Sequence, residues 1–304
     1  MNDLNEKIEA SIFIPTKNPG PEFKDILKGI FDQKKVNFEL IVVDSGSNEQ
    51  VLKMMSDYPL QLFQIRPEEF GHGKTRNLAL KYVKGDYVVF MTQDATPGDN
   101  FWLRNLLDGF TDGKVAGVFS RQIPKADARG NEIFFYSYHF PDKFIIRPNP
   151  RTTNPLDKNF FSNVSSCLKK EIFAKYPFDE SLIMSEDQQW SKEVIEAGYK
   201  TVYNPNSIVV HSHNYNLRQT FARYFDSSFS LRQIVDSNFR MFTKTKARYA
   251  VEEFWYALKK SPHKIFYLFL FNLARTAGTF AGWRAESFPV WIKKRISMHS
   301  YYWN

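Results

Sequence analysis

The stretch ASIFIPTKN, residues 10–18, joins an apolar run to a short polar motif. The same pattern returns twice within the first 100 residues, as LIVVDSGS at residues 40–47 and VVFMTQDA at residues 88–95. Short apolar runs bounded by turn-forming residues indicate buried strands. Ligands of open α/β sheets bind outside the carboxyl ends of the strands. The three polar motifs therefore predict a ligand site along one edge of a sheet.

Helical periodicity fills the spaces between these strands. Apolar residues from Phe23 to Ile30 recur at i, i+3, i+4 and i+7, which predicts a helix with one buried face. Further helices are expected near residues 54–55, 74–83, 101–110 and 186–197, and further strands near residues 60–65, 87–92, 115–120, 200–203 and 208–211. Strands that alternate with helices predict an α/β fold, with a mostly parallel sheet flanked by helices.

Residues 122–161 show neither periodicity. They contain five prolines among many aromatic residues. A segment of this length without regular structure is usually functional or disordered. Its aromatic content favours a loop that covers the substrate.

The composition is that of a globular protein in a reducing compartment. The chain has 304 residues, 43% of them hydrophobic, and Cys167 is its one cysteine, so an internal disulfide is excluded. Residues 1–9 are polar, and we expect no secretory signal peptide there. These features favour a cytoplasmic protein.

The net charge of +8 is unevenly distributed. Residues 217–304 hold 15 Lys and Arg against 5 Asp and Glu, and the remaining residues hold 26 against 28. Aromatic residues recur among these cations, but no apolar run approaches the roughly 20 residues that a membrane-spanning helix needs. Residues 217–304 are therefore predicted to be basic, aromatic helices that lie on an anionic membrane surface. The alternative is a helical subdomain packed on the core. Nucleic-acid binding is disfavoured because no reader motif accompanies the charge.

A metal site is predicted from one carboxylate and two imidazoles. Asp94 follows an apolar strand, where a carboxylate can hold a divalent cation against a diphosphate. His211 and His213 lie on the same side of an extended segment. Imidazole with carboxylate suits Mn²⁺ and does not exclude Mg²⁺. The alternatives are a loop aspartate and structural histidines.

Two further motifs suggest nucleotide contacts. Asp44 could accept hydrogen bonds from a base or ribose, or form an Asx turn with the residues that follow it. The run GHGKTRN at residues 71–77 fails as a P-loop because Glu68 stands where the first glycine is required. Lys74 and Arg76 would still lie near a helix N-terminus, which attracts phosphate. A basic helix start on the surface is the alternative.

Ser185, Glu186 and Asp187 open a predicted helix, with Ser185 as its N-cap. Acidic residues in a first turn often only complement the helix dipole. One of the two carboxylates could instead act as general base toward an acceptor hydroxyl.

Taken in order, these motifs resemble family 2 glycosyltransferases of the GT-A fold over residues 10–215. The resemblance implies a nucleotide-sugar site and a catalytic pair in which Asp187, beside Glu186, is the base. It also implies a divalent cation, Mn²⁺ or Mg²⁺, at the place of the family's DxD motif. The implied nucleotide-sugar residues are Pro15, Thr16, Asn18, Asp44, Gly73, Lys74, Arg76, Gln93 and Asp94, and the implied metal ligands are Asp94, His211 and His213.

Within that family, TQDA at residues 92–95, SRQIP at 120–124 and VHSHNY at 210–215 are similar to bacterial rhamnosyltransferases. That likeness implies a dTDP-L-rhamnose donor, inversion at the sugar, and a polyprenyl-diphosphate-linked acceptor in cell-wall, capsule or O-antigen synthesis. It places the protein at the inner face of the cell membrane. Only Asp94 remains of the DxD acids, so metal binding would need a histidine. The QxxRW motif of processive synthases is missing, which favours addition of one or a few sugars.

We therefore expect a GT-A domain over residues 1–216 and a helical extension over residues 217–304. The nucleotide-sugar half of the domain would span about residues 10–120 and the acceptor half residues 121–216. A sugar-phosphate nucleotidyltransferase is the main alternative, but such an enzyme needs a glycine-rich loop directly after the first strand, and residues 15–18 do not supply one. A catalytically degenerate scaffold is the other, and the intact Asp44, Asp94 and Glu186–Asp187 pair disfavours it.

Overall fold

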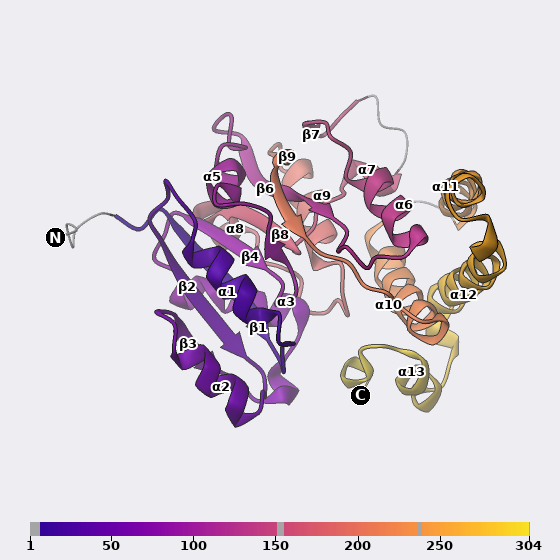
Figure 1. Ribbon diagram of the computed structural model, residues 1–304, viewed down its shortest axis with the longest axis horizontal. Helices are drawn as coiled ribbons and strands as arrows, with labels where there is room; N and C mark the ends of the chain where they lie inside the picture. The colour runs from indigo at the N-terminus through magenta and orange to yellow at the C-terminus, as the bar shows by residue number, and fades with distance from the viewer. Residues whose placement is uncertain (1–6, 151–154, 236–238, 304) are drawn as a thin grey trace.

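The computed structural model describes residues 7–150, 155–235 and 239–303, and a nine-stranded sheet forms their centre (Figure 1). In spatial order the strands are β3 (Gln61–Gln64), β2 (Phe38–Asp44), β1 (Ala10–Thr16), β4 (Tyr87–Met91), β8 (Ser165–Lys169), β6 (Val115–Ile123), β9 (Lys200–Val210) and β5 (Thr96–Pro97), with β7 (Ile145–Arg147) paired to β9. Helices cover both faces, so the α/β class predicted from the sequence is confirmed.

The sheet is parallel in its first half and mixed in its second. Strands β3, β2, β1 and β4 run parallel, and β8 lies antiparallel between β4 and β6. Strand β8 is reversed because it begins at the carboxyl end of β4, where Ser165 pairs with Met91. Strand β9 is parallel to β6 and antiparallel to β5 and β7. Residues 200–210, expected as two short strands, form one strand with a register shift.

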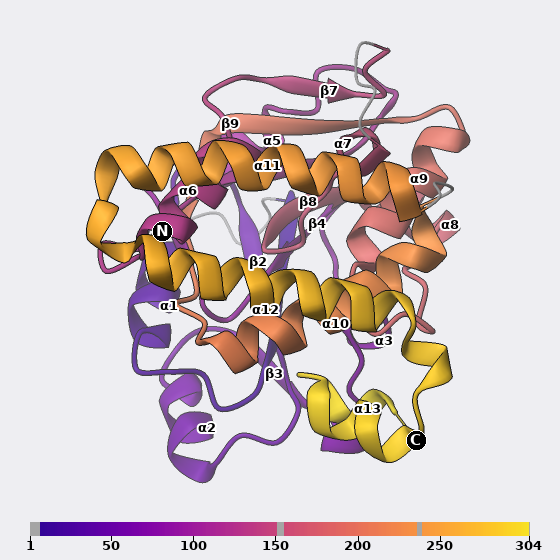
Figure 2. The same ribbon diagram turned by 90° about the vertical axis from the view of Figure 1, so that its right-hand side faces the viewer.

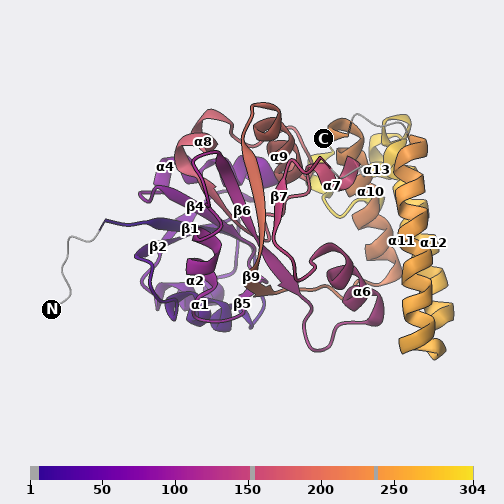
Figure 3. The same cartoon turned by 90° about the horizontal axis from the view of Figure 1, so that it is seen from above.

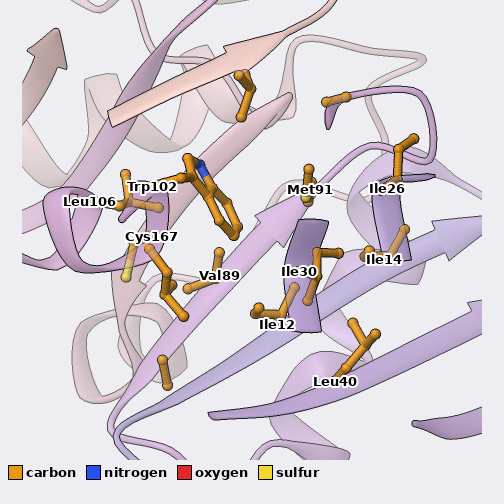
Figure 4. Close-up of a cluster of buried hydrophobic side chains, with 14 of the residues drawn as sticks. Ile12, Ile14, Ile26, Ile30, Leu40, Val89, Met91, Trp102, Leu106 and Cys167 are labelled. Atoms are coloured by element: carbon orange, nitrogen blue, oxygen red, sulfur yellow. The ribbon is translucent and has the colours of Figure 1, made fainter. Parts of the chain in front are cut away.

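One apolar layer lies between the sheet and α1 (Phe23–Phe31), α2 (Glu49–Ser56) and α5 (Trp102–Leu107). The four apolar residues of α1 that set its helical period are all buried, as predicted. Ile30 lies beside Ile12 and Ile26 lies beside Ile14 of β1 (Figure 4). Complete burial of one such side chain stabilises the fold by roughly 1.5–3 kcal/mol. Cys167 of β8 is fully buried in this layer, and burial raises the pKa of its thiol.

The opposite face of the sheet is covered by α3 (His72–Asn77), α4 (Ala79–Tyr82), α8 (Lys170–Lys175) and α9 (Glu186–Glu196). Trp190 of α9 and Phe173 of α8 fill this second layer. The helix predicted at residues 74–83 is divided into α3 and α4 at Leu78. Short 3₁₀ helices lie at η1 (Pro67–Glu69), η2 (Pro262–Lys264), η3 (Ala285–Ser287) and η4 (Ser300–Tyr302).

The prediction that residues 122–161 form an irregular loop is wrong. They contain α6 (Gly130–His139), β7 and the short α7 (Pro155–Lys158). Helix α6 buries Phe134 and Tyr136, and Phe134 lies 5.2 Å from the ring of Tyr249. Because Phe134 packs outward on α11 while Tyr136 packs toward the sheet, the apolar residues form no single helical stripe. Residues 151–154 of this segment lie outside the described residues.

The remaining helices are α10 (Leu217–Ile234), α11 (Phe239–Lys260), α12 (Ile265–Trp283) and α13 (Val290–Ile296). Helices α11 and α12 lie side by side as an outer layer (Figures 2 and 3). Helix α12 approaches α10 closely, because a Cβ at Gly278 or Gly282 would lie 2.3 or 2.1 Å from a backbone carbonyl oxygen of α10. A buried ion pair between Arg275 and Glu253, 2.9 Å apart, joins α12 to α11. Among the described residues, no helix is both long and apolar enough to cross a bilayer.

Candidate active site

Asp94, His211 and His213 come together at the carboxyl ends of β4 and β9. The two-residue strand β5 pairs with Val209 and Val210, which holds the loop that carries Asp94 against the end of β9. The Nε2 atoms of His211 and His213 lie 3.5 and 3.3 Å from the two oxygens of Asp94. Ligand atoms that share a cation at about 2.1 Å are themselves roughly 3.0–3.4 Å apart. Each imidazole therefore lies at a distance from the carboxylate that suits a shared cation, and one ligand atom from each of the three residues lies within 4.8 Å of the others.

The protonation of this cluster also suits a metal. His211 is buried, and its Nδ1 lies 3.2 Å from Gln122 Oε1, which can only accept a hydrogen bond. When a cation is bound, His211 would therefore carry its proton on Nδ1 and present the Nε2 lone pair to the metal. Burial, helped by His211, lowers the pKa of His213 to about 4, so this ring is neutral at neutral pH. Burial opposes ionisation of Asp94, but its hydrogen bond to His211 and the two neighbouring imidazoles outweigh burial and hold its pKa well below the usual range.

Asp44 braces the loops after β1 and β2. Its carboxylate is buried and accepts hydrogen bonds from the Thr16 hydroxyl at 2.9 Å and from the backbone N–H groups of Gly46 and Ser47 at 3.0 and 2.8 Å. Gly46 has φ +107°, a left-handed conformation that favours glycine. The Asx turn that the sequence left open is therefore formed. Ser47 also accepts from the Asn18 N–H at 2.7 Å, which ties the two loops together.

Gln93 connects the loop after β4 to the loop after β1. Its side-chain oxygen accepts from the Lys17 N–H at 2.8 Å, and its amide nitrogen donates to the Lys17 carbonyl at 3.3 Å. Pro15 is half-buried in β1, where it pairs in register with Val43. The three polar motifs that follow β1, β2 and β4 thus lie along one edge of the sheet and are joined by hydrogen bonds.

Glu186 and Asp187, at the start of α9, occupy different environments. Glu186 is buried and pairs with Arg76, with 3.0 Å between Nη1 and Oε1. Asp187 is half-buried, and its two oxygens accept from the backbone N–H groups of Asn163 and Gln188 at 2.9 and 2.8 Å. Burial, together with the neighbouring charge of Glu186, raises the pKa of Asp187. A partly buried carboxylate with a raised pKa has the properties of a general base near neutral pH.

The helix start predicted at Ser185 is correct, but its side chain makes no capping hydrogen bond. Ser185 is left-handed, with φ 65° and ψ 23°, a conformation that costs energy in a residue with a Cβ. Its carbonyl instead accepts from the backbone N–H groups of Gln188 and Gln189. This backbone strain lies directly before the two acids.

The residues predicted to lie under the diphosphate are separated. Lys74 is exposed, whereas Arg76 is turned inward to Glu186. Gly73 is buried, and a Cβ there would lie 2.6 Å from the carbonyl oxygen of Asp179. Gly73 is therefore required by packing in this structure, and Lys74 is the member of the motif that is open to solvent.

Sequence reasoning missed Asn163, which contacts both acids. Its N–H donates to Asp187, its side-chain nitrogen to Glu186 at 3.2 Å, and its oxygen accepts from the Ser166 hydroxyl. The signal was its position just before β8, at the same edge as the end of β4. It was hidden because β8 was not predicted.

A family model described as glycosyl transferase family 2 matches residues 11–173 of the chain. The chain belongs to this family. It is therefore a glycosyltransferase, and the part of the chain that the model covers carries the Asp44 and Asp94 loops.

Two curated relatives resemble this glycosyltransferase over nearly its whole length. The O-antigen chain rhamnosyltransferase RfbN of Salmonella typhimurium is 31% identical, covering 98% of this chain and 96% of that protein. The O-antigen chain rhamnosyltransferase WbaN of Salmonella anatum is also 31% identical, covering 97% and 95%. Both alignments extend through the helices beyond the family model.

Solved structures share the GT-A fold. The mannosyltransferase PcManGT of Pyrobaculum calidifontis, determined with GDP-Man and Mn²⁺, superimposes with a TM-score of 0.57 at 17% identity, covering 97% of this chain and 84% of that one. TarS 1–349 of S. aureus, determined with UDP-GlcNAc, gives 0.53 at 16% identity over 95% and 84%. At these identities the likeness concerns the fold alone.

Proposed function

We propose that this glycosyltransferase moves L-rhamnose from dTDP-L-rhamnose to a polyprenyl-diphosphate-linked glycan in O-antigen synthesis, with inversion at the sugar. The observation that carries the proposal is the 31% identity to two O-antigen chain rhamnosyltransferases over 98% and 97% of the chain. The likeness includes the helices that lie beyond the residues matched by the family model.

The proposed chemistry assigns the acceptor proton to Asp187. The acceptor oxygen would attack the anomeric carbon as the bond from that carbon to the β-phosphate oxygen breaks, and Asp187 would take the hydroxyl proton. Attack from the face opposite the leaving group inverts the anomeric centre, so a β-linked donor gives an α-rhamnoside. Asn163 and Gln188 hold the Asp187 carboxylate through two backbone N–H groups. The ring would gain oxocarbenium character, as in glycoside hydrolysis.

The negative charge that develops on the leaving diphosphate would be stabilised at the side of the site opposite Asp187. Asp94, His211 and His213 would hold a divalent cation, Mn²⁺ or Mg²⁺, which supplies Lewis-acid neutralisation of the diphosphate. Lys74 is exposed on α3 and would contact the phosphates from the protein side. Asp44 and Gln93 would act by fixing the loops that present backbone groups to the nucleotide.

A donor panel tests this proposal. The purified protein would be incubated with dTDP-rhamnose, dTDP-glucose, UDP-GlcNAc and GDP-mannose and a polyprenyl-diphosphate-linked saccharide, with Mn²⁺ or Mg²⁺ present. We expect transfer from dTDP-rhamnose alone and an α-anomeric signal in the proton NMR spectrum of the product. Preference for another donor, or a β-product, would contradict the assignment.

The same assay separates the rival functions. A nucleotidyltransferase would form dTDP-rhamnose from dTTP and rhamnose 1-phosphate, releasing pyrophosphate, and we expect none. A degenerate scaffold would show no thermal stabilisation by dTDP, whereas a donor site stabilises the protein in proportion to the logarithm of ligand concentration.

We also propose that α11 and α12 dock this enzyme on an anionic membrane surface. Each helix exposes one stripe of large apolar side chains away from the core: Val251, Phe254, Trp255 and Leu258 on α11, and Phe266, Phe269, Leu273 and Phe280 on α12. Phe266 is 73% exposed and Trp255 62% exposed. Basic residues lie where the two helices join, at Lys259, Lys260 and Lys264. Apolar stripes flanked by cations are typical of helices that lie in the membrane interface.

Co-sedimentation with liposomes tests the docking. We expect binding to vesicles of phosphatidylcholine with phosphatidylglycerol, and weaker binding to phosphatidylcholine alone. Salt should weaken the binding without abolishing it, because apolar burial does not depend on ionic strength. If the protein ignores both vesicle types, these helices form an interface with protein instead.

A further inference from the structure

A line of hydrogen-bonding side chains runs from the helical region to the catalytic pair. Asp226 of α10 is fully buried, and its Oδ2 lies 2.9 Å from Nδ1 of His299. His299 Nε2 lies 3.1 Å from Nε2 of His72. His72 Nδ1 lies 3.4 Å from Nη1 of Arg76, and the same Nη1 donates to Glu186 at 3.0 Å. His299 and His72 are 227 residues apart in the sequence.

The donor and acceptor roles along this line follow from Arg76. A guanidinium can only donate, so His72 Nδ1 accepts and His72 must carry its proton on Nε2. His299 Nε2 then accepts from His72, and His299 carries its proton on Nδ1, which donates to Asp226. Burial, helped by the neighbouring His299 and Arg76, lowers the pKa of His72 well below the usual value and so favours this neutral ring. All four contacts are satisfied by one arrangement with both imidazoles neutral.

The hydrogen bonds that hold the Arg76 side chain are made by one of its nitrogens. Its Nε is buried without a hydrogen-bond partner in the described part of the chain. Its Nη1 makes the contacts to the His72 ring, the His72 carbonyl and Glu186. The His72 ring is therefore one of three contacts that fix where the guanidinium lies relative to Glu186.

We propose that His299 is a positioning residue for the transfer reaction, acting through His72 and Arg76 to hold Glu186 beside Asp187. The inference rests on the proposed role of Asp187 as base. Loss of the His299 ring would free His72 to turn, and Arg76 would follow, leaving the charge of Glu186 less well compensated. Asp187 would then hold its proton more tightly.

The segment that carries His299 is anchored independently of its ring. The backbone N–H groups of Met298 and His299 donate to Asp226 at 2.9 and 3.3 Å. The Tyr302 hydroxyl donates to the Ser181 carbonyl at 2.9 Å, and Trp303 is buried 4.8 Å from the ring of Phe229. A substitution of the His299 side chain should therefore leave the segment docked.

Two variants separate the two ends of the His299 ring. In His299→Asn the shorter amide can still donate to Asp226 but cannot reach His72. In His299→Gln the longer side chain can still accept from His72. Tyr302→Phe is the matched control, because it weakens the docking of the same segment without touching the line of contacts.

The readout is the titration of Asp187, measured by NMR of protein labelled with ¹³C at the aspartate carboxyl and assigned with Asp187→Asn. The charged and titratable groups near the line are Glu186, Arg76, His72, Asp226, Arg223 and Tyr301. We expect the Asp187 midpoint to rise by roughly 0.5–1 pH unit in His299→Asn, less in His299→Gln, and not in Tyr302→Phe. The acidic limb of the kcat profile should move by the same amount, with kcat lowered about tenfold and the donor KM unchanged.

An Asp187 midpoint that is equal in all four proteins would overturn the inference, whatever the kinetics show. The titration needs no substrate, so it remains decisive if the proposed donor is wrong. If Asp187→Asn keeps the acidic limb of kcat, the base assignment fails instead, and the titration still reports on His299.

Discussion

The two parts of this enzyme differ in what they leave exposed. We call the described residues up to 216 the sheet domain and the described residues from 217 onward the helical region. In the sheet domain, polar groups at the strand ends are joined by hydrogen bonds, and large apolar side chains lie between the sheet and its helices. Among the described residues, twelve of the sixteen exposed large hydrophobic side chains lie between Val251 and Tyr301. The large apolar side chains of the sheet domain are mostly covered within the described residues, whereas the surface of α11 and α12 is suited to a further apolar contact.

The contrast also concerns charge. The buried ion pair of the sheet domain, Arg76 with Glu186, lies beside the proposed base. The buried pair of the helical region, Arg275 with Glu253, joins two helices, and Arg275 also lies 4.8 Å from the ring of Tyr249. One pair can influence proton transfer and the other can only hold the outer layer together. Variants of the two regions should therefore affect separate measurements.

The largest expected effect is that of Asp187→Asn in the sheet domain. Removing a general base should lower kcat by roughly 10²- to 10⁴-fold. Because the pKa of Asp187 is raised, wild-type kcat should increase with pH through that pKa and level off above it, where the carboxylate is ionised. Initial-rate measurements across pH check this, and liposome binding should be unaffected. Activity within a few fold of wild type would move the role to Glu186 or elsewhere.

Asp94→Ala should have the next largest effect, through the metal. Loss of one ligand and its charge should reduce transfer by about 10²-fold and weaken donor binding. EDTA should suppress the wild-type reaction, and Mn²⁺ or Mg²⁺ should restore it. Titration calorimetry with Mn²⁺ provides a readout that does not depend on turnover. Unchanged Mn²⁺ affinity in Asp94→Ala would exclude this cluster as the metal site.

The apolar stripe can be tested with Phe266→Ser combined with Phe269→Ser. Removing two exposed aromatic rings should weaken liposome binding by about 10- to 100-fold, since each buried ring contributes on the order of 1 kcal/mol. Phe101→Ser, at an exposed ring of the sheet domain, is the control. Transfer to a soluble acceptor analogue should stay at the wild-type rate. If the double variant and Phe101→Ser bind liposomes equally well, the exposed apolar residues of α12 do not contribute to docking.

Neutralising one lysine, Lys260→Gln, should give the smallest effect. Near an anionic surface each basic residue contributes about 1 kcal/mol, and salt screens this contribution. We expect binding roughly fivefold weaker at low salt and a smaller difference at high salt. Lys260 is preferable to Lys293, which lies 4.8 Å over the ring of Trp303. Lys28→Gln, which gives the same change in net charge on the sheet domain, is the control and should bind as the wild type does.

Local patterns predicted the parts of the structure that local contacts build. Helix α1 could be predicted because the period of its apolar residues is a local pattern. The convergence of Asp94 with His211 and His213 could be predicted because sheet topology brings strand ends together. The metal itself and the roles of the site residues remain predictions.

Contacts between distant segments could not be predicted. Arg76 was expected at a phosphate because its helix start looks basic, and nothing in that motif reveals Glu186, 110 residues away. Helix α6 was missed because its aromatic residues contact both the sheet and α11, which removes the one-sided period. Asn163 was missed because it precedes β8, and the start of β8 lies at the carboxyl end of β4 only because β8 runs antiparallel to β4.

The burial of Cys167 has a practical consequence for observing this enzyme at a bilayer. Its thiol is the only one in the chain, is fully enclosed by the sheet and stays protonated at neutral pH. Maleimide reagents require an accessible thiolate, so the wild-type protein should remain unlabelled. A cysteine introduced at Trp255, which is 62% exposed, would then be the sole attachment point for a nitroxide or an environment-sensitive fluorophore. The depth of α11 in a lipid layer could be measured without first removing a native cysteine.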